Sequence, residues 1–386
     1  MESNLSKCIL FFGLNYLDDK NNSLDKKKYL LFNSLLKSSK VRITNFMLVI
    51  SLYDDLDFKC HFRLTRNSVE VLMCKMKPYY IRQTNVGRPV VDFKKATLMT
   101  IWYLSNTETF RQIGDRFGLN RGHACRTIHK YLQSLSILLD DFIIWPKGIS
   151  ETITVQEFKN LRLNYMPNTI GCIDGCHIRI HSPKYKRSEY TNRKMFQSIV
   201  LLAVCNANLE FTYIFSGWPG SSHDARVFKN SSLGDTLLNN PQEIVTKDVH
   251  ILGDSAFPLL ESLIVPYKAV HILSEKEKLF NKRLSSTRVV IEQAFGLLLG
   301  RFRRLKSLEA KSIRLMSLTV TGACILHNLV LKNNDLMKID TDTEHLNLDH
   351  LIEETETNQE FTVPISRNQK NGIDKRNMLA SRFYED

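Results

Sequence analysis

The sequence predicts an α/β protein in which a mixed sheet flanked by helices follows an N-terminal all-α domain. From residue 58 to about residue 139, apolar residues recur at spacings of three and four, as on one face of a helix. Residues 168–267 instead contain short runs rich in β-branched and aromatic residues, separated by polar or Gly/Pro segments. Two apolar helical patterns follow at 287–305 and 315–331. The expected order after residue 168 is β-β-β-α-β-(α)-β-α.

The 386 residues suffice for two or three domains. We expect a weakly specified extension over 1–55, a helical, helix-turn-helix-like domain over 56–150 and the α/β domain over 165–332. The remainder, 333–386, begins with an excess of acidic residues and is predicted to be a flexible linker and tail.

Composition narrows the class of protein. Lys and Arg number 53 against 40 Asp and Glu, a net charge of +13, which favours polyanionic partners such as nucleic acid. Eight cysteines with no evident secretory leader are typical of reduced thiols in the cytosol or nucleus. The longest apolar run, near residues 46–53, is far shorter than the ~20 residues that span a bilayer, so we expect no membrane segment.

A helix-turn-helix pattern lies within the helical domain. Phe110, Ile113 and Phe117 follow helical spacing, residues 118–120 form a Gly-containing turn, and a second apolar helical pattern follows. The alternative interpretation is an ordinary αα-hairpin with a solvated basic face. The second helix is predicted to contact DNA through Arg121, Arg126 and Lys130.

Four acidic residues stand at predicted strand ends or helix starts: Asp174, Asp224, Asp254 and Glu292. Asp174 and Asp254 each end an apolar strand, where a carboxylate is costly unless a partner compensates its charge. A divalent cation such as Mg²⁺ or Mn²⁺ is such a partner, and three carboxylates can hold two ions about 3.5–4 Å apart. The pattern indicates a metal site for phosphodiester chemistry.

Four ordered motifs resemble the PIF/Harbinger transposases and the Harbinger transposase-derived nucleases: IDGCHIRI, FSGWPGSSHDARVF, LGDSAFPLLESLIVPY and RVVIEQAFGLLLGRFRRLK. The resemblance extends over roughly residues 58–333. It implies a ribonuclease H-like core of the DDE superfamily, a two-ion Mg²⁺ or Mn²⁺ site and DNA as substrate. It also implies a nuclear location and a separate Myb-like DNA-binding partner, and leaves the oligomeric state open.

The resemblance assigns roles to the four acids. Asp174 matches the acid of the first strand, Asp254 the acid after the fourth strand, and Glu292 the acid of the long helix. These three are the predicted catalytic metal ligands. Asp224 belongs to a His-Asp pair and is predicted to lie next to the metal ligands and to contact them. A direct metal contact is not needed to explain it, because the helix dipole already favours an acid near a helix start. Glu261 competes for the third position, but its place seven residues after Asp254 is expected to point it elsewhere.

The chain departs from the family at Cys176, where Thr is frequent, and at Leu299, where Lys is usual, and neither change removes a carboxylate. Basic residues interleaved with tyrosines after the first strand are typical of a surface that tracks phosphates and stacks on bases, although a solvated loop would look similar. Further predicted DNA contacts are Lys184, Lys186, Arg187, Arg301, Arg303 and Arg304.

Three other features receive plainer interpretations. A zinc site is set aside because strand side chains alternate between faces, which separates Cys172, Cys176, His177 and His181. His327, within an apolar helix, is predicted to be a hydrogen-bonded core histidine. Trp218 is predicted to follow a strand at a tight turn, with stacking on substrate bases as the alternative.

The sequence thus favours a metal-dependent DNA endonuclease of the DDE type, in which water, or in strand transfer a DNA 3′-hydroxyl, attacks a phosphodiester. The rival hypothesis is a domesticated DNA-binding or scaffold protein that keeps the fold without catalysis, because a fold does not by itself imply an activity.

Overall fold

The structure is a computed structural model that describes residues 42–80, 90–161, 165–181, 187–269, 272–309, 312–335 and 367–385. From Thr44 onwards these residues form one compact unit. The predicted DNA contacts Lys184 and Lys186 lie outside the described residues.

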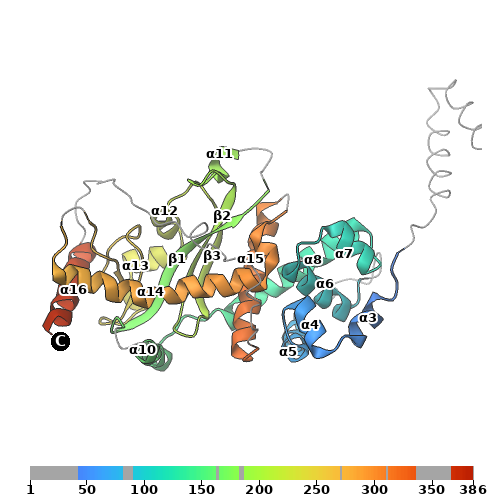
Figure 1. The fold of residues 1–386 in the computed structure, drawn as a ribbon, viewed down its shortest axis with the longest axis horizontal. Coiled ribbons are helices and arrows are strands. Elements are labelled where there is room, and N and C mark those ends of the chain that lie inside the picture. Colours follow the sequence, from blue (N-terminus) through green and yellow to red (C-terminus); the bar gives the residue numbers. More distant parts are fainter. Residues whose placement is uncertain are drawn as a thin grey trace, which may run out of the picture. The chain divides into compact units, whose positions relative to one another are not determined.

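A group of helices forms the first part of this unit (Figure 1). Several of its helices begin at side-chain caps. The Thr65 side chain, which the sequence predicts to be an N-cap before the apolar positions 69, 72 and 76, accepts from the Ser68 N–H, and Thr109 forms a capping box with Gln112. The bounds are α3 Phe46–Leu52, α4 Asp55–Phe62, α5 Arg66–Met76, η1 Lys77–Tyr79, α6 Phe93–Ser105, α7 Phe110–Arg116, α8 Arg121–Leu135, η2 Ser136–Leu138, α9 Leu139–Phe142 and α10 Ile149–Leu161.

The helical region starts earlier than predicted. Phe46 and Ile50 of α3 are buried, and the Phe46 ring packs edge-on against Trp102 at 5.5 Å and Phe117 at 5.2 Å between centroids. Because these contacts join α3 to α6 and to the end of α7, the boundary predicted near residue 55 is wrong. The two apolar residues of α3, four apart, were the signal for it.

A five-stranded mixed sheet forms the second part. Its order is β3-β2-β1-β4-β5, with β2 antiparallel to both of its neighbours, β1 and β3, and with β4 and β5 parallel to β1. The strands are β1 Thr169–Arg179, β2 Ser198–Cys205, β3 Phe211–Pro219, β4 His250–Leu252 and β5 Leu263–Ile264. This is the ribonuclease H-like arrangement, and the predicted fold class is confirmed.

The lengths of β1 and β4 create a notch in the sheet. β4 pairs with β1 only from Thr169 to Cys172, whereas β2 pairs with β1 from Cys172 to Arg179. Beyond Cys172, no strand among the described residues pairs with this edge of β1, and Leu308 bridges the chain only at Ile180, just past the end of β1. A side chain on β1 past that point can meet residues that follow the end of β4.

Helices cover both faces of the sheet (Figure 1). Alternate residues of β1 pack into two separate apolar clusters, Cys172 and Cys176 into one and Ile173 into the other. The first cluster includes α14 Glu275–Arg301 and α15 Ile313–Lys332, and the second includes α12 Asp224–Lys229 and α13 Ser232–Asn239. Short 3-10 turns, η3 Pro241–Glu243 and η4 Arg303–Lys306, complete the connections.

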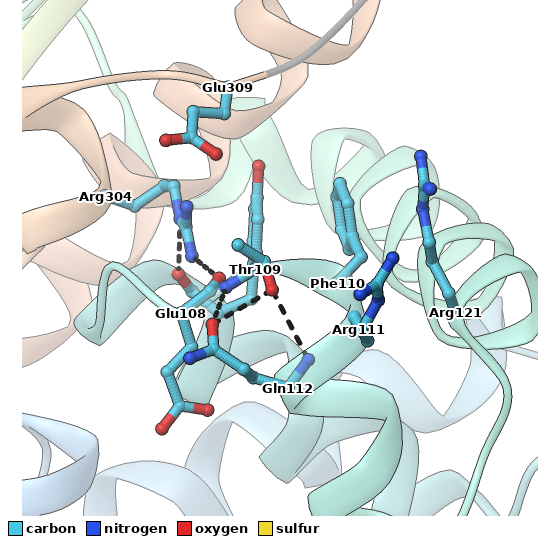
Figure 2. A pocket seen from close by; sticks show the side chains of 9 residues that line it. Glu108, Thr109, Phe110, Arg111, Gln112, Arg121, Arg304 and Glu309 are labelled. Carbon is cyan, nitrogen blue, oxygen red and sulfur yellow. Dashed lines mark hydrogen bonds between the residues drawn. The ribbon is translucent and has the colours of Figure 1, made fainter.

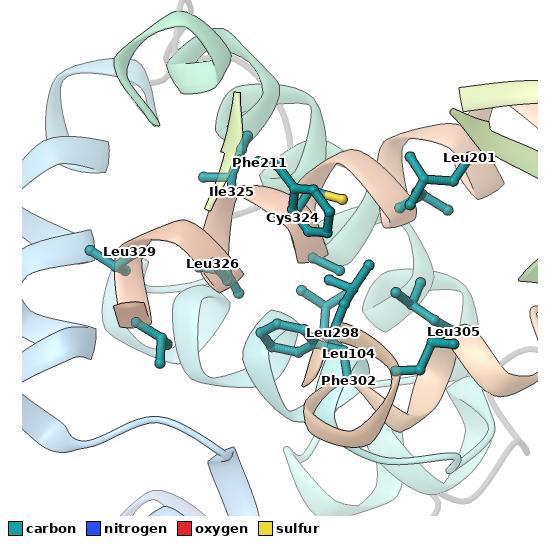
Figure 3. Close-up of a cluster of buried hydrophobic side chains, with 14 of the residues drawn as sticks. Leu104, Leu201, Phe211, Leu298, Phe302, Leu305, Cys324, Ile325, Leu326 and Leu329 are labelled. Carbon is teal, nitrogen blue, oxygen red and sulfur yellow. The ribbon is translucent and has the colours of Figure 1, made fainter. Parts of the chain in front are cut away.

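The helical region and the sheet share one apolar core. Figure 3 shows side chains from both parts meeting in it: Leu104 of α6, Leu201 of β2, Leu298 of α14 and Leu326 of α15. Among the described helices, α15 is the one long and apolar enough to cross a membrane by length and composition, and it is mostly covered by protein, as expected of a core helix. The two predicted domains are thus continuous through α14 and α15.

Two buried arginines strengthen this junction. Arg304 is 3% exposed; its Nε donates to the Tyr103 carbonyl at 3.1 Å and its Nη2 donates to the Glu108 carbonyl. Arg301 is 5% exposed, and its Nη1 donates to the Arg63 carbonyl at 3.1 Å. Each arginine therefore ties the end of α14, or η4 just after it, to the backbone of the helical region.

Asp335 completes the junction from the end of α15. Its carboxylate accepts from Lys59 Nζ at 2.8 Å, the Thr65 N–H at 2.6 Å and the Ser68 hydroxyl at 2.9 Å. These hydrogen bonds to the charged form lower the pKa of Asp335 against the opposing effect of burial.

The last helix, α16 Arg367–Glu385, packs against α14. Leu379, Ala380 and Phe383 are buried, and Lys375 Nζ donates to the Val249 and Glu261 carbonyls at 3.1 and 3.0 Å. Residues 367–385 are therefore part of the fold, and the predicted tail is wrong for this segment.

The junction yields a test of stability. Arg304→Ala removes a donor from the buried Tyr103 carbonyl and from the part-buried Glu108 carbonyl, and leaving a buried carbonyl unsatisfied costs about 1–3 kcal/mol. We expect urea denaturation to show a loss of roughly 3 kcal/mol in the free energy of unfolding. Arg314→Ala, at an exposed position of α15, is the matched control and should change it little. A small effect of Arg304→Ala would show that this junction does not stabilise the fold.

Candidate active site

Three acidic side chains meet at the notch. Asp174 lies on β1 two residues past the last pairing with β4, Asp254 follows β4 by two residues, and Asp224 is the first residue of α12. One carboxylate oxygen from each lies within 4.8 Å of the others. The sheet topology therefore brings together residues separated by as much as 80 positions.

Asp224 reaches the cluster because Gly175 has no side chain. A Cβ on residue 175 would lie 2.3 Å from Asp224 Oδ1 and 2.8 Å from its Cγ. No real Cβ tolerates such a contact, so the carboxylate occupies space that any other residue would fill. The Asp-Gly sequence on β1 thus supplies one acid and the room for another.

The environment of Asp174 is unusual for a carboxylate. The side chain is 1% exposed; its Oδ1 accepts from the Gly175 N–H at 2.8 Å and its Oδ2 from Arg288 Nη2 at 2.8 Å. Burial raises the pKa of Asp174 above its ordinary value, Arg288 opposes that effect, and the charges of Asp254 and Glu292 add to it. The Arg288 guanidinium therefore offsets only part of the combined effect of burial and of the neighbouring acids on Asp174.

The structure revises the choice of the third acid. Asp224, predicted to stand beside the ligands, is a member of the close cluster, whereas Glu292 is not. Glu292 lies one helical turn beyond Arg288 on α14, and Arg288 is the α14 residue that contacts Asp174. Glu292 nevertheless lies near enough for its charge to raise the pKa of Asp174. Glu261 accepts from Asn371 of α16 at 2.8 Å, which confirms that it points elsewhere.

Two basic residues contact the acids or their neighbours. Arg193, which contacts the ring of His223 just before Asp224, belongs to the basic, tyrosine-containing segment that the sequence predicts to contact DNA. Arg288 pairs with Asp174, a role that the sequence did not predict. Arg288 was visible as the first residue of the fourth motif, four positions before Glu292. Its partner was not, because 114 residues separate the two in the chain.

The predicted DNA-contacting residues of the helix-turn-helix segment lie on the surface. α7 and α8 are joined by a turn with Gly118 at φ 67°, and Arg121, Arg126 and Lys130 of α8 are exposed. Figure 2 shows Arg121 beside Arg111, which the sequence did not single out, at a hollow of about 570 Å³ between α7 and the segment after α14. Arg126 and Lys130 line a second hollow of about 250 Å³.

The other predicted DNA contacts within the described residues are partly buried and partly exposed. Arg301 and Arg304 are buried and bound to backbone carbonyls, so their prediction as DNA contacts is wrong. Their guanidinium groups are held inside the protein because they satisfy carbonyls of the helical region. Arg303 is half-buried, and Arg187 is exposed on α11 Arg187–Tyr190.

The remaining sequence features occupy ordinary positions. Cys172 and Cys176 are buried on one face of β1, where burial raises the pKa of both thiols, and His177 shares a hydrogen bond with the Ser198 hydroxyl at 2.9 Å. His327 is a core histidine, as predicted: its Nε2–H donates to the Leu209 carbonyl at 2.9 Å and burial lowers its pKa to about 4. Trp218 lies within β3, where it pairs with Val200, so its predicted place in a turn after the strand is wrong; its side chain is partly buried against the second apolar cluster.

Comparison with known proteins places this site in context. Residues 173–328 match the family model described as DDE superfamily endonuclease. HARBI1 of Homo sapiens, by its name a candidate nuclease, is 28% identical over 269 residues, 66% of this chain and 74% of the relative. The protein of the same name from Rattus norvegicus is 30% identical over 228 residues, 58% and 62% of the two chains. An ALP1-like protein of Arabidopsis thaliana is 26% identical over 302 residues, 73% and 72%. No solved structure matches.

The close approach at Gly175 can be tested directly. In Gly175→Ala the added methyl group must push the Asp224 carboxylate away from Asp174, so we expect the stabilisation of the protein by Mn²⁺ in thermal unfolding to fall sharply. Gly122→Ala on α8 is the control, because its Cβ would meet the flexible end of Arg126 at 3.3 Å and the Asn120 side chain at 3.6 Å, far from the acids. An unchanged response of Gly175→Ala to Mn²⁺ would show that Asp224 is not needed for metal binding.

Proposed function

Because the chain belongs to the PIF/Harbinger family, as its match to the DDE superfamily endonuclease model over residues 173–328 and its similarity to HARBI1 and an ALP1-like protein support, we propose that it is a metal-dependent DNA endonuclease. The observation that carries the proposal is the meeting of three carboxylates at the notch between β1 and β4. Such a group of hard oxygen donors beside an open sheet edge suits metal-assisted hydrolysis of a phosphodiester.

The donor set fits Mg²⁺ or Mn²⁺. All three members offer carboxylate oxygens, one from each lying within 4.8 Å of the others, and a divalent cation would compensate their charges. Burial raises the pKa of Asp174, and the charges of Asp254 and Glu292 raise it further. We propose that Asp174, Asp224 and Asp254 hold two ions, with Glu292 as a nearby fourth acid. When bound, such ions lower the pKa of an attacking water and neutralise charge on the phosphate.

Each of the three carboxylates would then have its own role at the site. Asp174 lies on β1, is buried and accepts from the Gly175 N–H of the same strand, so it can fix the position of the site. Asp254 is partly exposed and can face the substrate strand. Asp224, at the start of α12, has the helix N-terminus to stabilise its ionised form.

DNA would follow exposed basic residues. Arg121, Arg126 and Lys130 of α8, together with Arg111, provide charges able to pair with phosphates, in keeping with the net charge of +13. Arg187, on the segment between β1 and β2, is a further candidate contact nearer the acids in sequence. We propose a nuclear location and a Myb-like partner as well, because the family resemblance implies both.

The central test is cleavage. We expect the purified full chain to nick supercoiled plasmid in the presence of Mg²⁺ or Mn²⁺ and not in EDTA. Asp174→Asn should abolish nicking, because it removes a charged carboxylate ligand of the metal. Circular dichroism and thermal unfolding should show that the variant remains folded. Gel separation of supercoiled and open-circular DNA gives the readout.

The same assay separates the competing third acids. From the geometry we expect Asp224→Asn to lose nicking as completely as Asp174→Asn, and Glu292→Gln to lose less. Glu261→Gln, whose carboxylate contacts α16, is the control and should stay active. Full activity in Asp174→Asn would refute the catalytic proposal, whereas DNA binding without nicking in the wild type would favour the scaffold hypothesis.

The DNA surface has a separate test. Arg121→Ala with Arg126→Ala should weaken duplex binding and reduce the slope of log affinity against log salt by about one unit for each phosphate that is no longer neutralised. Fluorescence anisotropy with a labelled duplex in EDTA measures this without cleavage. Arg314→Ala, which removes an exposed charge from α15, is the control. Equal affinity and slope in the double variant would identify α7 and α8 as a plain αα-hairpin.

A further inference from the structure

The ion pair between Arg288 and Asp174 stands in the middle of the acid cluster. Arg288 Nη2 lies 2.8 Å from Asp174 Oδ2, and the two side chains are 13% and 1% exposed. Arg288 comes from α14 on one face of the sheet, whereas Asp224 comes from α12 on the other. The guanidinium thus enters the notch from the opposite side to Asp224.

Both carboxylate oxygens of Asp174 are already engaged. Oδ1 accepts from the Gly175 N–H and Oδ2 accepts from Arg288. The backbone hydrogen bond is fixed by the strand, so a ligand that needs a further lone pair of Asp174 competes chiefly with Arg288. A guanidinium and a divalent cation close to the same carboxylate also repel each other strongly at low dielectric.

Arg288 can leave Asp174 at modest cost. Within the described part of the chain, the bond to Asp174 is its one hydrogen bond, and its buried Nε–H has no partner. Arg304 differs, because two of its nitrogens donate to carbonyls in the junction. The long Arg288 side chain can therefore change rotamer without breaking a larger network.

We propose that Arg288 is a resident counter-cation of the acid cluster, which holds Asp174 in the metal-free protein and is displaced from it when a divalent cation binds. The proposal rests on the proposed function only in taking the cluster as a metal site. It adds a competitor that sets the apparent metal affinity. It also explains how a buried carboxylate beside two other acids remains in place without metal.

Two measurable consequences follow. Without Arg288 the carboxylates lose their compensating charge, so the metal-free protein should be less stable. At the same time a cation no longer has to displace a guanidinium, so it should bind more tightly. A residue with a merely structural role would give the first effect without the second.

The experiment compares the wild type, Arg288→Met and Arg288→Lys as full chains at one pH. Calorimetric titration with MnCl₂ and thermal unfolding in EDTA give affinity and stability independently of cleavage. We expect Arg288→Met to bind Mn²⁺ about tenfold more tightly, which is about 1.4 kcal/mol, and to unfold at a lower temperature in EDTA. Arg288→Lys, which keeps the charge on a group with weaker carboxylate pairing, should lie between the two.

Lys282→Ala, an exposed position on the same helix, controls for the loss of one positive charge and should leave affinity unchanged. Equal or weaker Mn²⁺ binding by Arg288→Met would overturn the proposal, and if that variant does not fold, equal or weaker binding by Arg288→Lys would do so. Binding by the wild type that Asp174→Asn leaves intact would instead refute the metal site. If Arg288→Met bound Mn²⁺ and the wild type did not, the result would support the competition between Arg288 and the metal. If neither protein bound Mn²⁺, both the metal site and the displacement of Arg288 would be refuted.

Discussion

The buried carboxylate of Asp174 is the constraint on which the rest of this structure depends. A charge at 1% exposure is tolerated only where hydrogen bonds and opposite charge replace water. The strand supplies one hydrogen bond from Gly175, and α14 supplies a guanidinium. The sheet must also leave the β4 edge of β1 unpaired just past Cys172, because a longer β4 would fill the notch in which the other acids meet.

Helix α14 connects this site to the remainder of the fold. It packs against α16, its middle carries Arg288 and Glu292, and its end, with η4, holds Arg301 and Arg304 in the junction with the helical region. A single continuous helix therefore fixes the acid site relative to the exposed arginines of α8. This continuity holds the exposed basic surface of α8 and the acid site in one rigid arrangement, as the proposed DNA cleavage would need.

The local rules of the chain were sufficient for much of this architecture. Alternation and strand length predicted the order of strands and helices, since each pattern reports how a segment packs its own face. Asp174 and Asp254 could be selected because a carboxylate at the end of an apolar strand is costly by itself. The Thr65 cap and the core position of His327 were equally local, as each depends on neighbours within one or two turns.

The sequence by itself determined the fold class, two of the clustered acids and the basic character of α8, because these follow from periodicity, motif order and charge. Only the tertiary structure decided that Asp224 joins Asp174, since the missing Cβ of Gly175 admits a carboxylate from a helix 49 residues further along. It also decided that Arg301 and Arg304 are buried rather than exposed, because a basic run looks the same whether its partners are phosphates or backbone carbonyls. Such choices depend on which elements meet in space, and a one-dimensional pattern carries no information about the partner.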